Sequence, residues 1–518
     1  MSEYHFNLLE EPWIPVKLKN NQFKVLNIKD TLLKANEIIR ISSSNPLVEI
    51  SIHRLLLAIL HRNFGPKDRQ EWFELYQLGN WDDRKLSNYF SKWYAKFDLF
   101  GDEKSRFYQI DISEEIDNST PVTKLHHALS SGNNAALFDH NWDSEVRPVP
   151  VEQAIQLLIS FQNFAVGGGV SRPFNYSHAP LVSGFAVLLH GKNLFETQML
   201  NFIRYDVDHP FKMIESNKDI PFWERKEKVL DQNKRGRFPF GYLDLLTWQS
   251  RRIWLEPLYV DNKICIKHLK LAQGEKIKEM WNEDPQMVYI FDKKNQKRSL
   301  RLQPDKQVWR DTESLLRLND TTNKTIPPKA INWVSLLIQE NMIPYSNRYS
   351  IEIYGLCNDP SKAAKIINWS HAYIPLPLIY LTDQSLVDNV KSFLAKCEKV
   401  ERILNKTMYF FAKQYLFPDS TSLSSTQNTR LNDFIQSYQL RIRFWNMIEN
   451  YFYSFIEEIA EARDIGKRND ILNTTVEKII SRSGDLLNSV KENLKNDPRA
   501  FKSLTQNFGY FFSKVKNM

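Results

Sequence analysis

At 518 residues the chain is too long for a single hydrophobic core, so we expect at least two domains. Hydrophobic residues make up 42% of the sequence and aromatic residues 13%, which excludes a largely disordered protein. An excess of 69 lysines and arginines over 61 aspartates and glutamates gives a net charge of +8. This charge favours a polyanionic partner, although many basic proteins bind none.

Three cysteines, Cys265, Cys357 and Cys397, lie far apart and form no Cys-x-x-Cys motif. The sequence therefore supports neither a disulfide framework nor a cysteine zinc site. The N-terminus has no basic segment followed by an apolar one, and no apolar run is long enough to span a bilayer. We expect a soluble, unexported chain in the reducing cytoplasm, with no membrane among its partners.

The first part of the chain mixes predicted strands and helices. Residues 5–28 alternate short apolar and polar groups around two prolines, which predicts a β-hairpin. From Ile50 the apolar residues recur at helical spacing, and a second helix is predicted from about Trp72 to Leu78. A polar loop follows at residues 130–146. Loops of this length inside a folded domain are usually functional or disordered.

Three consecutive glycines, Gly167, Gly168 and Gly169, stand out in a chain that has only 16. They follow an apolar helical pattern and precede Arg172. Without a Cβ atom, a backbone can approach a ligand closely or adopt a positive φ angle. A packed turn explains the triplet equally well, so the triplet alone does not decide between packing and binding.

Residues 220–310 carry the densest positive charge, with aromatic residues between the basic ones. Such repetition favours contact with phosphates, while a solvated basic face is the alternative. The basic residues are Arg225, Lys226, Lys228, Lys234, Arg235, Arg237, Arg251, Arg252, Lys263, Lys267, Lys270, Lys276, Lys278, Lys293, Lys294, Lys297, Arg298 and Arg301.

The C-terminal part is predicted to be wholly helical. One helix is capped by Thr382 and runs past Phe411, and others are expected at about 430–460, 470–494 and from 498 to the end. Four amphipathic segments with short links predict an antiparallel four-helix bundle. The predicted fold class is α+β: a mixed N-terminal α/β domain with a β-rich basic region at residues 1–375, then the bundle at residues 376–518.

Motifs typical of catalytic and metal centres are missing from the sequence. It contains no Walker loop, no Gly-x-Ser-x-Gly, no His-Glu-x-x-His and no cluster of cysteines and histidines at metal-ligand spacing. We therefore expect no enzymatic activity, no cofactor and no bound metal.

Eight segments stand in a characteristic order along the chain: residues 6–16, 54–58, 123–125, 134–139, 167–169, 245–252, 354–356 and 364–366. Together they resemble the CasA family, the large subunit of the type I-E CRISPR surveillance complex Cascade. No single segment is specific, but their order and spacing together are, and the resemblance covers the whole chain.

This resemblance implies a non-catalytic subunit that recognises DNA. In that family the large subunit reads the protospacer-adjacent motif (PAM) of target double-stranded DNA, largely through the minor groove, and starts the strand separation that leads to an R-loop. A bare glycine backbone suits a minor groove about 6 Å wide. The implied partners are the other Cascade proteins, the CRISPR guide RNA, the target duplex and a helicase-nuclease recruited to the R-loop.

The resemblance also assigns individual residues to these contacts. Gly168 matches the glycine that faces the groove. Lys276 best matches the lysine that reaches into the groove, with Lys278 as the alternative because a nearby gap leaves the register open. The loop that touches the guide RNA and the neighbouring PAM region matches these residues: Asn134, Leu137, Phe138 and Asp139.

The segment after Gly355 departs from the family pattern. Ala364 aligns with an alanine that contacts the PAM, whereas Ala363 stands where the family has a wedge glutamine. A wedge must replace the stacking that is lost when the first base pair opens, and an alanine offers little surface for this. The preceding Lys362 could instead bind the displaced phosphate or base edge, which would change PAM preference or the opening step.

Two other classes of function stay open. A structural scaffold or nonspecific DNA clamp would explain the bundle and the aromatic residues, and its binding would ignore the PAM sequence. A nuclease would require acidic or histidine ligands that converge only in space.

Overall fold

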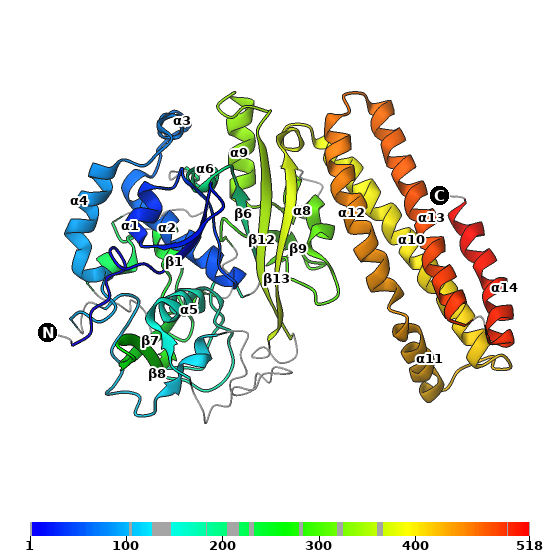
Figure 1. Ribbon diagram of the computed structural model, residues 1–518, viewed down its shortest axis with the longest axis horizontal. Coiled ribbons are helices and arrows are strands. Elements are labelled where there is room, and N and C mark those ends of the chain that lie inside the picture. The colour runs from blue at the N-terminus through cyan, green and yellow to red at the C-terminus, as the bar shows by residue number, and fades with distance from the viewer. Residues whose placement is uncertain are drawn as a thin grey trace. The chain divides into compact units, whose positions relative to one another are not determined.

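The computed structural model describes residues 3–102, 106–126, 147–182, 184–204, 217–226, 233–278, 283–318, 325–359, 366–494 and 496–516. The chain divides into two units. The first holds residues 1–304 and 317–373, and the second holds residues 305–316 and 374–518. Strands gather in the first unit and long helices in the second, which confirms the predicted α+β class (Figure 1).

The first unit begins with a small antiparallel sheet. Strands β1 (Ile14–Leu18) and β2 (Phe23–Leu26) form the predicted hairpin, and β3 (Ile38–Ile41) pairs with the other edge of β1. Helix α1 (Ile28–Leu33) lies between β2 and β3 in the sequence and is capped by Asn27, whose side chain accepts from the Asp30 N–H. The hairpin prediction is confirmed.

Helix α2 (Pro46–Phe64) forms the centre of the first unit, and almost all of its residues are buried. It contacts α5 (Val151–Phe164) on one side and β12 (Arg348–Asn358) on another. Its neighbours along the chain are α3 (Arg69–Leu78) and α4 (Asp83–Trp93). The helices that we predicted from Ile50 and from Trp72 are therefore present.

A three-stranded sheet packs against α2, with β12 between β6 (Phe185–His190) and β13 (Ile366–Pro377). Residues from α2, α5, β6 and β12 form one apolar core, which includes Leu47, Ile50, Phe164, Leu188 and Tyr354. Two further helices, α6 (Leu194–Leu200) and α9 (Lys329–Gln339), contact strand β6 of this sheet.

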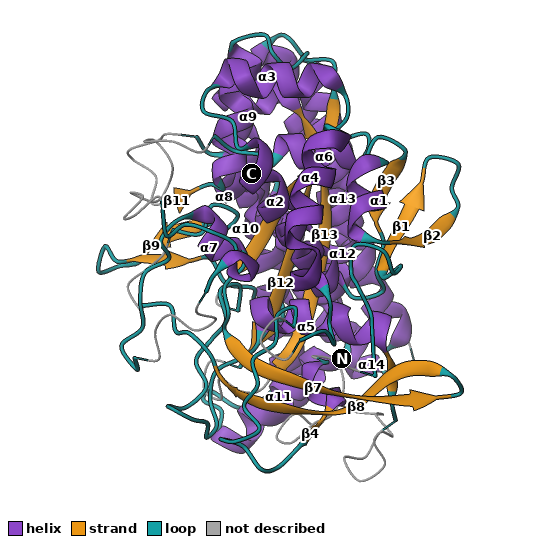
Figure 2. Ribbon diagram, turned by 90° about the vertical axis from the view of Figure 1, so that its left-hand side faces the viewer, coloured by secondary structure: helices purple, strands orange, loops and turns teal. Residues whose placement is uncertain are grey.

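A long β-hairpin dominates the basic region. Figure 2 shows β7 (Arg251–Val260) and β8 (Lys263–Gln273) side by side, and they are paired antiparallel along their whole length. The short strands β4 (Thr120–Pro121) and β5 (Val149–Pro150) pair with β8 as well. The expected β-rich character of this region is confirmed.

The remaining elements are short. A small sheet combines β9 (Tyr289–Phe291) with β10 (Lys297–Ser299) and β11 (Thr325–Ile326). The short α-helices are α7 (Tyr242–Leu246) and α8 (Thr312–Leu316). The 3-10 helices are η1 (Tyr94–Phe97), η2 (Val122–Leu125), η3 (Phe222–Glu224), η4 (Val308–Asp311) and η5 (Leu378–Leu381).

The second unit is helical, as predicted, but its helices differ from the expected four. Within residues 374–494 and 496–516 the structure has five α-helices: α10 (Gln384–Leu416), α11 (Ser425–Ser437), α12 (Leu440–Glu461), α13 (Ile465–Asn493) and α14 (Pro498–Val515). Helix α10 contacts each of the other four. The prediction of one helix at 430–460 is wrong, because the backbone turns left-handed at Gln439, with a φ of 48°, and separates α11 from α12.

The cap of α10 also differs from the prediction. Asp383, rather than Thr382, is the capping residue, and its carboxylate accepts from the Ser385 N–H. The same carboxylate pairs with Arg468 of α13 at 2.9 Å. The sequence offered two adjacent capping side chains, and the ion pair to a distant helix favours the aspartate.

Aromatic side chains fill the interior of the second unit, as we predicted from the apolar stripe. Phe444, Trp445, Phe452 and Phe455 are all at most 1% exposed. Trp309, from the segment 305–316, lies 4.6 Å from the ring of Phe452. Among the described residues, no helix is both long and apolar enough to cross a membrane.

Arg54 of α2 provides a test of the first unit's stability. Its guanidinium lies 3.0 Å from the Asp284 carboxylate and 2.7 Å from the side-chain oxygen of Gln286. The side chains of Arg54 and Asp284 are almost fully buried. We expect Arg54→Met to lower the free energy of unfolding by about 3–5 kcal/mol, because it leaves a buried carboxylate unpaired. Urea denaturation measures this change. As a control, Arg69→Met breaks a half-exposed pair with Glu340 and should cost less than about 1 kcal/mol; equal losses would contradict the prediction.

Candidate nucleic-acid interface

Two loops meet at the last residue of β8: one follows α5 and is hydrogen-bonded to Gln273, and the other continues the chain after Gln273. We call residues 165–178 the glycine loop and residues 274–278 the lysine loop. The backbone N–H of Gln273 donates to the Ser171 hydroxyl at 2.9 Å, and its side-chain oxygen accepts from the Ser177 N–H at 2.8 Å. Because the lysine loop continues directly from Gln273, one strand end holds both loops.

The three glycines have different roles. A Cβ atom on Gly167 would lie 2.9 Å from the backbone nitrogen of His178, so this glycine is required by packing. Gly168 and Gly169 are exposed and have φ angles of 102° and 87°, a region that side chains disfavour. The Gly168 N–H donates to the Tyr176 carbonyl, and the Tyr176 N–H donates to the Gly169 carbonyl. The packing and binding interpretations of the triplet therefore apply to different glycines.

Arg251 holds the glycine loop through hydrogen bonds to its backbone. Its guanidinium is buried and donates to the carbonyls of Ala165, Val166 and Ser177 at 3.3, 3.0 and 2.8 Å. It also lies 4.9 Å from the centre of the Tyr176 ring. Within the described part of the chain no carboxylate pairs with it, and burial lowers its pKa to about 10. The arginine therefore stays charged at neutral pH, and its hydrogen bonds to backbone carbonyls stabilise that charge.

The lysine loop is paired with the segment just before α7. The Arg237 N–H donates to the Lys276 carbonyl, and the Lys278 N–H donates to the Arg237 carbonyl, both at 3.0 Å. Gly236 has a φ of 74°, and a Cβ atom there would lie 2.5 Å from the Lys276 carbonyl oxygen. Lys276 is half-buried and Lys278 is exposed. Both candidate lysines therefore lie on a loop with a defined backbone.

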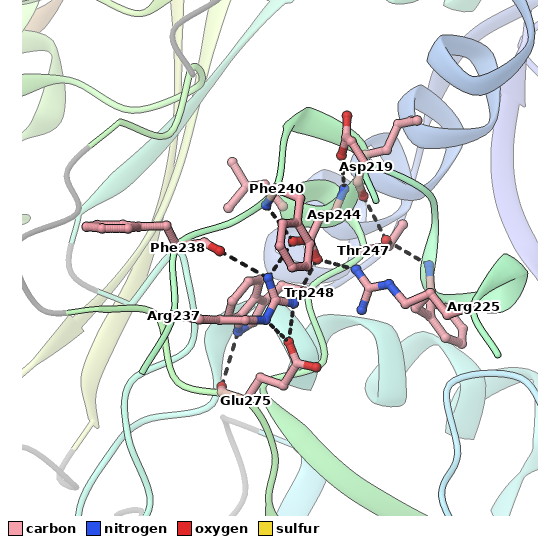
Figure 3. A network of polar contacts seen from close by, with 12 residues as sticks. Asp219, Arg225, Arg237, Phe238, Phe240, Asp244, Thr247, Trp248 and Glu275 are labelled. Atoms are coloured by element: carbon pink, nitrogen blue, oxygen red, sulfur yellow. Dashed lines mark hydrogen bonds and ion pairs between the residues drawn. The ribbon is translucent and has the colours of Figure 1, made fainter. Parts of the chain in front are cut away.

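Glu275 of the lysine loop belongs to a network of buried ion pairs (Figure 3). The Arg237 guanidinium lies 2.6 Å from the Asp244 carboxylate and 2.9 Å from the Glu275 carboxylate, and Arg225 also pairs with Asp244. Burial raises the pKa of Asp244, but the two arginines outweigh burial and hold that pKa below its usual value. Burial raises the pKa of nearby Asp219 to about 7. These contacts fix the backbone on both sides of Lys276.

The structure corrects our view of the basic segment. Four of its arginines bind groups of the protein itself, so they are not available to phosphates: Arg225, Arg251 and Arg252, which are buried, and Arg237, whose side chain is 10% exposed. Their partners lie far along the chain, which a local run of charge cannot reveal. The exposed cations beside the lysine loop are Lys234, Arg235 and Lys278.

The structure thus brings Gly168, Lys276 and Lys278 to two loops at one strand end. Four further candidates, Asn134, Leu137, Phe138 and Asp139, lie outside the described residues. Lys362, Ala363 and Ala364 also lie outside them, in the connection between β12 and β13. Sequence reasoning missed the residues that support the loops, Arg251, Gln273 and His178, because each acts through backbone groups that only the fold brings near.

One group of side chains has the spacing of a metal site. Glu49, Glu352 and His371 present ligand atoms within 4.8 Å of one another. Arg40, however, lies 3.4 Å from the Glu49 carboxylate and 3.3 Å from that of Glu352. Burial raises the pKa of Glu352, but His371, His190 and Arg40 outweigh burial and lower it to about 2. A protein cation therefore already occupies the space between these carboxylates.

His178 accepts a hydrogen bond within the glycine loop on a nitrogen that protonation would block. The Gly167 N–H donates to the unprotonated Nδ1 of His178 at 2.8 Å, and burial with the charges of Arg251 and Arg301 lowers the pKa of His178 to about 4. The unfolded chain, with an ordinary histidine pKa, binds more protons between about pH 6.5 and 4. We therefore expect this stabilisation to be complete above about pH 6.5 and to be lost as the pH falls towards 4.

Urea unfolding of wild type and His178→Asn at pH 7 and pH 5 measures this contribution. The asparagine oxygen can still accept from the Gly167 N–H but does not titrate, so the variant should lose less stability on acidification. The same pH dependence in both proteins would contradict the assignment.

Comparisons with known proteins identify the family. The family model described as CRISPR-associated protein Cse1 matches residues 7–482. The CRISPR-associated protein CasA/Cse1 of Thermus thermophilus is 28% identical over 463 residues, which cover 88% of each protein. The crystal structure of Thermus thermophilus CasA, at 23% identity, superposes with a TM-score of 0.81 over 99% of this chain and 100% of that one.

A chain of a CRISPR RNA-guided surveillance complex has the same fold. It is 18% identical to this chain and has a TM-score of 0.75, with coverage of 98% of this chain and 99% of the other. The resemblance inferred from the sequence is confirmed, and because the family model spans most of its length, the chain belongs to the Cse1 family of CRISPR-associated proteins.

Proposed function

We propose that this chain is the large, non-catalytic subunit of a type I-E Cascade complex, and that it reads the PAM of target double-stranded DNA through the minor groove. The proposal includes a role in duplex opening, in R-loop formation and in recruitment of a helicase-nuclease. The observation that carries it is the exposed, left-handed backbone at Gly168 and Gly169, held at the same strand end as Lys276. Membership of the Cse1 family supports the assignment.

The glycine loop presents backbone groups that suit a minor groove. The Gly168 N–H and the Gly169 carbonyl are used within the loop, whereas the Gly168 carbonyl and the Gly169 N–H have no hydrogen-bond partner among the described residues. The minor groove offers acceptors on every base pair and a donor on guanine. One acceptor and one donor on a loop without Cβ atoms could therefore contact base edges in a groove about 6 Å wide.

The lysine loop would supply the electrostatic part of binding. Lys276 and Lys278 lie on a backbone fixed by Arg237, and the chain reaches Lys276 only three residues after Gln273, which also holds the glycine loop. Phosphate contacts of this kind position a protein on DNA without reading sequence. We propose that the two loops act together, the glycines at base edges and the lysines at the groove wall or backbone.

The proposed partners follow the family. They are the other Cascade proteins, the CRISPR guide RNA, the target duplex and the helicase-nuclease, in the cytoplasm. We assign guide RNA contacts to Asn134, Leu137, Phe138 and Asp139. The second candidate, a scaffold or nonspecific clamp, would rely on the positive charge of the basic segment, and the internal pairing of four of its arginines weighs against that. No observation favours a nuclease.

PAM selection by the reconstituted complex tests the proposal. With a randomised PAM library at fixed salt, the wild type should enrich a short motif. Gly168→Asp should abolish enrichment, because a side chain enters the groove, and Lys276→Ala should weaken binding by roughly 10-fold and lower its salt dependence. Lys263→Ala is the matched control, since this exposed lysine lies at the opposite end of β8. Equal retention of all sequences by the wild type would instead favour a scaffold or nonspecific clamp.

The connection between β12 and β13 gives a separate prediction. We propose that Ala364 contacts the PAM and that Lys362, rather than a wedge glutamine, binds the displaced strand beside Ala363. Lys362→Ala should then change the enriched motif or reduce the rate of duplex opening, which a fluorescent base next to the PAM reports. Unchanged selection, affinity and opening would remove the lysine from the mechanism.

A further inference from the structure

Phe238 is an exposed aromatic residue on a rigid support. Its side chain is 38% exposed and points away from the ion network, as Figure 3 shows. Its backbone is fixed, because the Arg237 side chain donates to the Phe238 carbonyl at 3.1 Å and the Arg237 backbone pairs with the lysine loop on both sides. Part of this apolar ring therefore stays in contact with solvent, because the fixed backbone around it does not let the ring turn inward.

Buried ion pairs hold the segment that carries Phe238. Asp244 and Glu275 are fully buried carboxylates, and both are paired with Arg237. Removing one partner from such a buried pair is strongly destabilising, so the segment is expected to keep its conformation on binding. A pre-organised aromatic ring loses little conformational freedom when a ligand stacks on it.

One cation lies over the ring of Phe238, and two more precede it in the sequence. The Lys278 ammonium lies 4.8 Å from the ring centre, and Lys234 and Arg235 precede Phe238 on the same short segment and are exposed. None of these three cations has a carboxylate partner within the described residues. An exposed aromatic ring with a cation over one face, and with two more exposed cations close to it in the sequence, matches a nucleotide, whose base stacks and whose phosphates are negative.

We propose that Phe238 is a stacking platform for an unpaired base of single-stranded nucleic acid, with Lys278 and its neighbouring cations holding the adjacent phosphates. This inference deepens the proposed function and rests on it: the platform lies on the segment that pairs with the lysine loop, so it would receive a base released when the duplex opens. The excess of cations favours a nucleic acid over a protein partner, which would need an acidic surface.

Binding of a single-stranded oligomer by the full chain tests the proposal. The probe is a fluorescein-labelled deoxythymidine oligomer of about 15 nucleotides, measured by anisotropy at fixed salt. Phe238→Ala should weaken binding about 5-fold or more, since stacking on an aromatic residue contributes about that much or more per base. Phe238→Trp should retain the affinity, and Lys278→Ala should weaken binding and lower its salt dependence.

Phe23 provides the matched control. Its ring is 69% exposed and has the Lys17 ammonium 5.9 Å from its centre, but it lies on the β1–β2 hairpin. Phe23→Ala should leave oligomer binding unchanged. Unfolding midpoints of the variants establish that each is folded, and retained binding by Phe238→Trp shows that the site itself is intact.

Three results would overturn the stacking platform: no measurable oligomer binding by the wild type, equal affinity of wild type and Phe238→Ala, or a loss in Phe238→Ala that is confined to assembly with the other proteins of the complex. The last result would assign the ring to protein docking. Failure of the proposed function looks different, because the wild-type complex would then show no PAM enrichment while Phe238→Ala still weakened oligomer binding.

Discussion

The buried guanidinium of Arg251 is the contact on which the candidate interface depends. A loop with two left-handed glycines has little conformational preference of its own, since glycine loses more conformational freedom on folding than any other residue. Arg251 compensates by donating to carbonyls on both arms of the loop, at Ala165 and Val166 and again at Ser177. The other terminal nitrogen of the guanidinium also donates to the Ser250 carbonyl and to the Gln273 side-chain oxygen. The group thus reaches five acceptors at once, whereas a lysine ammonium has only three donors.

The arrangement at β8 couples two elements that are far apart in the sequence. Gln273 holds the glycine loop through Ser171 and Ser177, and three residues later the chain reaches Lys276. A displacement of β8 would therefore move both loops together. A double substitution at Gly168 and Lys276 is expected to be non-additive for this reason, because the two residues would contact one ligand from one rigid support.

Much of the fold could be predicted from the sequence, because local patterns determine it. Alternation predicted the β1–β2 hairpin and helical spacing predicted α2, whereas nothing in the residues around Gln439 marked a left-handed turn between α11 and α12. The candidate site was harder. The triple glycine and Lys276 were found, but the pairing of Arg237 with Glu275 joins residues 38 positions apart, and only the fold shows that these charges neutralise each other.

The division between arginines and lysines follows from their chemistry. Arg225, Arg251 and Arg252 are buried and the Arg237 side chain is 10% exposed, and all four guanidinium groups bind carbonyls or carboxylates at fixed geometry. Guanidinium is more weakly hydrated than ammonium and has more donors, so burying it costs less free energy. Lysines such as Lys278 remain in solvent on flexible stems. The proposed interface therefore combines a rigid backbone, which can discriminate shape, with mobile surface charge, which attracts any phosphate. Discrimination among DNA sequences would then come from the glycine backbone, and the lysines would set affinity and its salt dependence.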